Sequence, residues 1–86
     1  MPQISQFYGI VIAMFFNDHV PPHFHAYYGG DEATIIIGSG DVYDGSLPRR
    51  ALRLVREWEE LHRNDLLANW ELARRPAPLN QIAPLP

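Results

Sequence analysis

Residues 23–37, HFHAYYGGDEATIII, decide the fold because they predict two strands joined by a tight turn. The first six residues alternate between an apolar set and a histidine-bearing set: Phe24, Ala26 and Tyr28 against His23, His25 and Tyr27. Gly29-Gly30 then supplies the positive φ angles that short hairpin turns need. Glu32–Ile37 forms the returning strand. The stretch therefore predicts an antiparallel hairpin whose histidines share one face.

The flanking segments extend this hairpin into a sheet. Phe7–Phe16 is almost wholly apolar and predicts one long, well-covered strand. Asn17–Pro22 reads as a loop, and Val42–Tyr43 begins a short strand after the glycines at 38 and 40. We expect Phe24 and its neighbours to face the core and both histidines to point away from it. Exchanging His23 and His25 for alanine would then leave the fold intact.

The second half of the chain predicts two helices. At helical spacing one arc is apolar and carries Ala51, Leu54, Val55, Trp58, Leu61 and His62. A second helix reaches Arg75 and is expected to bury Leu66, Leu67 and Trp70. These elements predict an α+β domain over residues 1–75, with a small, mainly antiparallel sheet of three to four strands and two C-terminal helices on one face. Residues 76–86 hold four prolines and read either as an extended strap or as a tail.

Composition excludes several classes of protein. The 86 residues are 47% hydrophobic and contain no cysteine, which excludes disulfides and thiolate metal sites and fits a cytoplasmic protein. The longest apolar run, Ile10–Phe16, is far shorter than a membrane span, and no signal-peptide pattern is present. We therefore expect no membrane partner.

Charge is divided unevenly along the chain. Residues 1–48 carry five acids and no lysine or arginine, whereas residues 49–86 carry all seven arginines. Docking of the arginine half on the acidic half of its own chain or of a neighbouring copy explains this pattern, which leaves a homo-oligomer open. The net charge of −3 differs from the positive net charge that is typical of nucleic-acid-binding domains.

The segment Asp18-His19-Val20-Pro21-Pro22-His23-Phe24-His25-Ala26 carries the candidate site. The prolines stiffen the approach to the strand, on which His23 and His25 lie at i and i+2. With His19 or Asp18 as a third ligand, these imidazoles could hold a divalent metal such as zinc or manganese.

Two other interpretations of the segment remain open. His23, His25 and His19 could act as acid and base in phosphodiester cleavage, with Arg49 and Arg50 binding the phosphate. Alternatively, the face formed by His23, His25 and Tyr27, next to Asp18, could bind a partner protein, because such surfaces are rich in tyrosine and arginine.

Three segments together resemble a bacterial family, the domain of unknown function 4160. They are ISQFYGI (4–10) leading to FNDH (16–19) and PPHFHA (21–26), LPRRA (47–51) leading to Trp58 and His62, and LLANW (66–70). The resemblance implies a small gene that often lies beside a second one, in toxin–antitoxin-like arrangements. We therefore expect a cytosolic interaction module that binds a partner protein, with RNA or DNA as a secondary partner. The alternative is a histidine-dependent nuclease or a metal-assisted phosphodiesterase.

Overall fold

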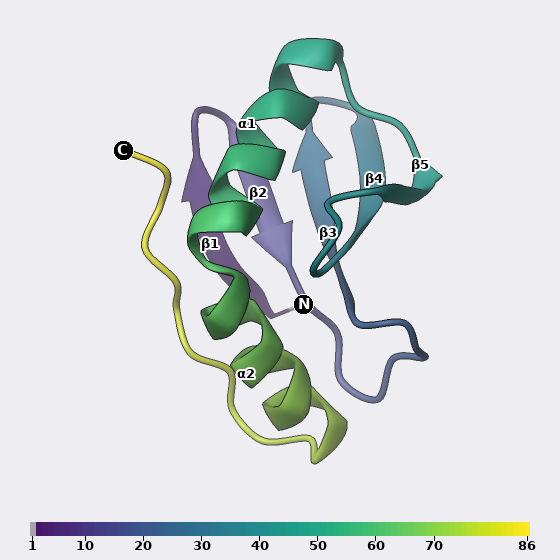
Figure 1. Ribbon diagram of the computed structural model, residues 1–86, viewed down its shortest axis with the longest axis vertical. Helices are drawn as coiled ribbons and strands as arrows, with labels where there is room; N and C mark the ends of the chain where they lie inside the picture. Colours follow the sequence, from purple (N-terminus) through teal and green to yellow (C-terminus); the bar gives the residue numbers. More distant parts are fainter. Residues whose placement is uncertain (1) are drawn as a thin grey trace.

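A computed structural model describes residues 2–86 as one antiparallel sheet followed by two helices (Figure 1). The strands are β1 (Gln3–Phe7), β2 (Ile10–Ala13), β3 (His23–Tyr28), β4 (Asp31–Ile36) and β5 (Val42–Gly45). The helices are α1 (Arg49–Leu61) and α2 (Arg63–Arg74). Each strand pairs with its neighbour in sequence, in the order β1-β2-β3-β4-β5. The predicted α+β fold is confirmed, with five strands instead of three or four.

The expectation of one strand over Phe7–Phe16 is wrong. Tyr8 and Gly9 both have positive φ angles, of 50° and 80°, and turn the chain so that Phe7 pairs with Ile10. The run is therefore split between the end of β1 and β2. A turn that contains tyrosine inside an apolar run lacks the polar residues by which hairpins are usually recognised.

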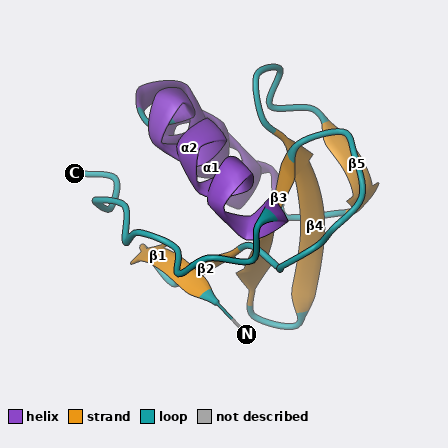
Figure 2. Cartoon of the chain, turned by 90° about the horizontal axis from the view of Figure 1, so that it is seen from below, coloured by secondary structure: helices purple, strands orange, loops and turns teal. Residues whose placement is uncertain are grey.

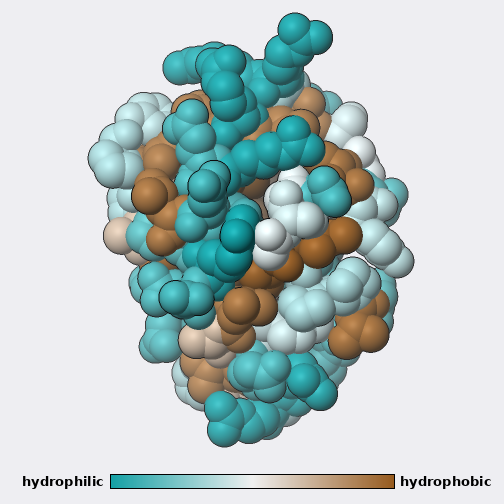
Figure 3. Space-filling model, viewed as in Figure 1, coloured by the Kyte–Doolittle hydropathy of each residue, from teal (hydrophilic) through white to brown (hydrophobic). Residues whose placement is uncertain are grey.

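Both helices lie on one face of the sheet, and the core fills the space between (Figure 2). The fully buried indole of Trp58 on α1 lies 5.6 Å from the Phe24 ring and 5.4 Å from the Phe7 ring, measured between centroids. Phe24 and Ala26 are buried, as the strand pattern predicts. Figure 3 shows the outer side of the helices, where a hydrophilic stripe follows α1.

Two leucines depart from the helical prediction. Leu61 and Leu67 are exposed, although both were expected on buried arcs. On α1, Glu59 is buried instead of Leu61, and it accepts hydrogen bonds from the Gly38 N–H and from the Arg63 guanidinium at 2.9 Å each. Burial alone would raise the pKa of Glu59, but these donors hold it below its ordinary value of 4.5. The hydrogen bond between Gly38 and Glu59 therefore holds the β4–β5 connection against α1.

Residues after α2 run as an extended segment along β1, which we call the strap (residues 76–86) (Figure 1). The Ile82 N–H donates to the Ile4 carbonyl, and the Trp58 indole N–H donates to the Ala83 carbonyl. The buried side chain of Asn69 on α2 makes two hydrogen bonds to the backbone of Asn80. The strap thus covers the outer edge of the sheet at β1.

Within residues 2–86, neither helix has the length and hydropathy that a membrane-spanning helix requires.

Candidate functional site

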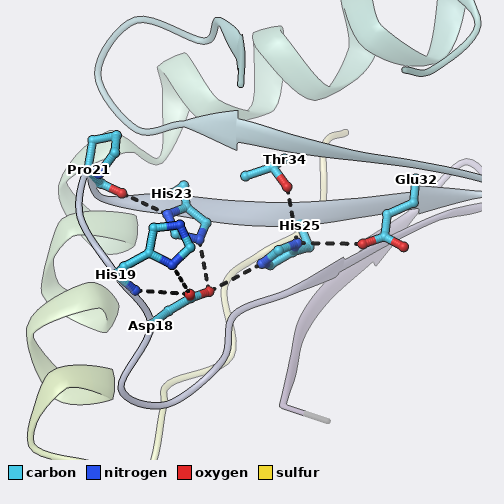
Figure 4. Close-up of polar contacts among 7 residues, drawn as sticks. All are labelled: Asp18, His19, Pro21, His23, His25, Glu32 and Thr34. Carbon is cyan, nitrogen blue, oxygen red and sulfur yellow. Dashed lines mark hydrogen bonds and ion pairs between the residues drawn. The ribbon is translucent and has the colours of Figure 1, made fainter. Parts of the chain in front are cut away.

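The site is assembled by the β2–β3 loop and the start of β3 (Figure 4). The loop carries Asp18 and His19, and the strand carries His23 and His25. Asn17 has a positive φ of 57°, and the Ile37 N–H donates to the Pro22 carbonyl, which ties the end of the loop to the β4 side of the sheet. The loop therefore returns over the start of β3 and brings the carboxylate to the imidazoles.

Asp18 is the centre of the cluster. Its Oδ2 lies 2.8 Å from Nε2 of His23 and 3.4 Å from Nε2 of His25. Its Oδ1 accepts the His19 N–H at 2.9 Å. Burial by itself raises the pKa of Asp18, but these hydrogen bonds outweigh it and hold the pKa below its ordinary value of 3.8. The carboxylate is therefore ionised at neutral pH.

His23 is buried, which differs from the expectation of an exposed imidazole. Its side chain is only 2% exposed, because its ring lies beside Trp70 of α2, with 5.2 Å between centroids. Nδ1 of His23 lies 2.7 Å from the Pro21 carbonyl oxygen. A carbonyl only accepts, so Nδ1 carries a proton, and Nε2 is directed at Asp18.

His25 is held in a similar orientation at the neighbouring position, with a side chain 15% exposed. Its Nε2 faces Asp18, and its Nδ1 lies 3.4 Å from Oγ1 of Thr34 and 3.7 Å from Oε2 of Glu32. Phe15 packs edge-on against the imidazole, with 4.7 Å between centroids. Both histidines thus present Nε2 to the carboxylate and Nδ1 to an outer acceptor.

Asp18, His23 and His25 offer three ligand atoms that all lie within 4.8 Å of one another. Two ligands about 2.1 Å from one metal are about 3.0–3.4 Å apart at tetrahedral or octahedral angles. The distances of 2.8 and 3.4 Å from Oδ2 to the two Nε2 atoms are close to this range. Outer acceptors on Nδ1 are also usual for metal-binding histidines. A divalent cation could be held here once the two Nε2 atoms, which lie within 4.8 Å of each other, come into the same range.

The third predicted histidine lies at the rim. The His19 side chain is 71% exposed and its Nδ1 lies 3.0 Å from Oδ1 of Asp18, the oxygen that faces away from the other two imidazoles. His19 is therefore near the cluster but outside the set of three converging ligand atoms.

A pocket of about 140 Å³ opens beside the cluster. Besides Asp18 and the three histidines, it is lined by Thr34 of β4 and by Tyr43 and Asp44 of β5. Sequence reasoning missed these three residues, and Glu32 with them. In the described part of the chain, no arginine side chain lines the pocket.

The other predicted binding residues lie apart from the pocket. Arg49 and Arg50 are exposed in the first turn of α1, which begins at the end of the sheet opposite the β2–β3 loop (Figure 1). Tyr27 is half-buried on β3, opposite Glu32, and both burial and this carboxylate raise the pKa of its hydroxyl. The structure thus brings the histidines and Asp18 together, and leaves both arginines away from them.

The fold and the site define an α+β domain in which one aspartate and two histidines converge at the edge of a surface pocket. The chain matches the family described as "Domain of unknown function (DUF4160)" over residues 9–71, and it belongs to this family. The matched region includes the whole cluster. No curated protein and no solved structure matches the chain.

Proposed function

We propose that this protein is a divalent-cation-binding domain, with Asp18, His23 and His25 as the ligands. One observation carries the proposal: three ligand atoms from a loop and a strand lie within 4.8 Å of one another, and the Pro21 carbonyl fixes the buried imidazole with Nε2 directed inward.

The chemistry of this ligand set suits zinc, manganese or iron. Two imidazoles and a carboxylate leave at least one coordination position for water or a substrate. That composition supports a metal-assisted hydrolytic reaction better than metal-free acid–base cleavage. Metal-free cleavage of a phosphodiester needs a cationic group for the phosphate, and Arg49 and Arg50 lie at the other end of the sheet.

Binding of a partner protein is the second candidate function. Its support is the outer face of the sheet, which the two helices leave uncovered apart from His23 at its end (Figure 2). Tyr43 at the pocket and Val20 in the β2–β3 loop are large apolar side chains exposed by 54% and 70%. Interfaces are enriched in such aromatic residues. A toxin–antitoxin-like pair, which the family resemblance suggests, would use this face.

Metal binding is tested by titrating zinc or cobalt(II) into protein pretreated with a chelator, followed by calorimetry and thermal unfolding. We expect one ion per chain and a melting temperature that rises with free metal, because a ligand at 100 times its Kd stabilises the folded state by about 2.7 kcal/mol.

The informative variant is His25→Ala, since His23 is too buried to be removed without cost. We expect it to weaken binding by more than the roughly 10–100-fold typical of lost outer contacts. His62→Ala is the matched control, because His62 is a partly exposed histidine next to Asp65, away from the cluster. Equal metal affinity in wild type and His25→Ala would overturn the proposal.

A further inference from the structure

We infer that the open side of the cation site admits neutral ligand atoms, such as an imidazole nitrogen, and discriminates against anions. The inference rests on the proposed function and concerns what completes the coordination. It is carried by two carboxylates beside the cluster that the ligand set does not use: Asp44, which lines the pocket, and Glu32, which lies next to His25.

Strand register places both carboxylates on the face of the ligands. His25 pairs with Thr34, and Thr34 pairs with Asp44, so these three residues lie side by side across β3, β4 and β5. Neighbouring strands are about 4.8 Å apart, which puts the backbone of Asp44 about 10 Å from that of His25. Asp44 lines the same pocket as all three ligands.

Glu32 approaches from the other direction along β4. Its Oε2 lies 3.7 Å from Nδ1 of His25. Glu32 also lines a second hollow between β4 and β5, which shares Thr34 and Asp44 with the pocket. Asp44 therefore lines the pocket itself, and Glu32 lies next to His25 just outside the pocket lining.

Among the described residues, no arginine forms an ion pair with these two carboxylates, and the contact of Glu32 is with the His25 imidazole. Residues 1–48 contain no lysine or arginine. Within residues 2–86, the arginine ion pairs involve Glu59 and Glu71, and none reaches Glu32 or Asp44. No arginine therefore neutralises these carboxylates, and salt screens their effect on the pocket.

Charge counting gives the direction of the effect. A divalent cation with the Asp18 carboxylate carries a net +1, and the two outer carboxylates turn the pocket to −1. An anion that reaches the metal must approach both, whereas a neutral imidazole or amide carbonyl experiences no such repulsion. Phosphodiesters are accordingly poor candidates for this site, and a neutral side chain of a partner or an uncharged carbonyl substrate is favoured.

The test uses cobalt(II)-loaded full-length protein at low ionic strength and follows the visible absorption of the metal. Imidazole and acetate are titrated as the neutral and the anionic probe, at a pH at which imidazole is unprotonated. Because cobalt prefers imidazole intrinsically, the informative quantity is how the acetate affinity changes when a carboxylate is neutralised.

We expect Asp44→Asn to raise the acetate affinity about tenfold and to leave the imidazole affinity unchanged. The matched control is Asp31→Asn, which removes an equal charge from the exposed first residue of β4, on the strand face opposite Glu32. The control should change neither affinity.

Failure of cobalt to bind the wild-type protein would refute the proposed function itself. If cobalt binds and acetate affinity is the same in wild type and in Asp44→Asn, the inference about anions is wrong while the metal site stands. An equal gain in Asp31→Asn would also overturn it, because the effect would then come from overall charge.

Discussion

Replacing each strand histidine separately with alanine should give very different losses of stability in the metal-free protein. His23 is 2% exposed and places both ring nitrogens on acceptors, at 2.7 and 2.8 Å. The contact with the Asp18 carboxylate is worth about 1.5–3 kcal/mol, and the bond to the Pro21 carbonyl about 1 kcal/mol. With the lost packing on Trp70, we expect His23→Ala to cost about 3–5 kcal/mol.

His25→Ala should be much milder. Its contacts with Asp18 and Thr34 are both 3.4 Å long, at the outer limit of hydrogen bonding, and its side chain keeps some solvent exposure. We expect a cost of about 1 kcal/mol. In a domain of this size each kcal/mol shifts the melting temperature by about 4–8 °C.

Thermal unfolding in the presence of a chelator, monitored by circular dichroism, compares the two variants with wild type. His23→Ala should melt at least 10 °C lower, or be unfolded, and His25→Ala should melt only several degrees lower. Urea unfolding gives the same comparison as free energies. Equal losses in both variants would refute the claim that the two imidazoles differ in burial and bonding.

Two further predictions concern α1. Trp58→Ala should lower the free energy of unfolding by about 3–5 kcal/mol or unfold the domain, since it removes a fully buried ring and leaves the Ala83 carbonyl unpaired. Leu61→Ala, on the exposed side of α1, should be nearly neutral when both variants are unfolded in urea. Glu59→Gln should cost about 2 kcal/mol at pH 7 by weakening the contacts to Arg63 and Gly38, and Glu60→Gln should not. Because the folded-state pKa of Glu59 is lowered, the stability it contributes is present above pH about 4.5 and is lost as the pH falls through the folded-state pKa. The free energy of unfolding should therefore fall less steeply below pH about 4.5 in Glu59→Gln than in wild type. The same acid dependence in both proteins would refute this.

Much of the fold could be predicted because local patterns determine it. The alternation in residues 23–28 places Phe24 in the core, and the glycine pair after it places the hairpin turn. The β1–β2 turn was missed although Gly9 is a typical residue for the second position of a two-residue turn, because Tyr8 is unusual at the positive φ of the first position. Apolar residues on both sides removed the contrast that usually marks a chain reversal.

The closeness of Asp18, His23 and His25 could be expected from the sequence, whereas the exposed position of His19 and the surroundings of the cluster could not. Counting outward from the glycine turn would have placed Thr34 opposite His25 and Glu32 opposite Tyr27. Asp44 was out of reach, because the register of β4 with β5 shifts between Thr34 and Ile35. Burial of His23 depends on Trp70, which comes from a helix distant in sequence.

The buried Glu59 carried a signal that was overlooked. It follows Val55 by four residues and therefore lies on the apolar arc of α1, where a carboxylate is buried only with partners. Arg63, a further four residues along, is the partner that the sequence offers. The second hydrogen-bond donor to Glu59, the backbone N–H of Gly38, could be located only from the folded chain.

The strap has a consequence for self-association. An outer strand of a sheet exposes backbone groups that can recruit a strand from another molecule and start aggregation. At β1 this edge is covered by a segment with prolines at positions 76, 78, 84 and 86, which have no N–H with which to pair a further strand. The opposite edge, β5, is only four residues long and carries the charged Asp44. Both edge strands of the sheet are therefore protected against pairing with another molecule. A chain that ended before residue 76 would expose the β1 edge and should aggregate more readily.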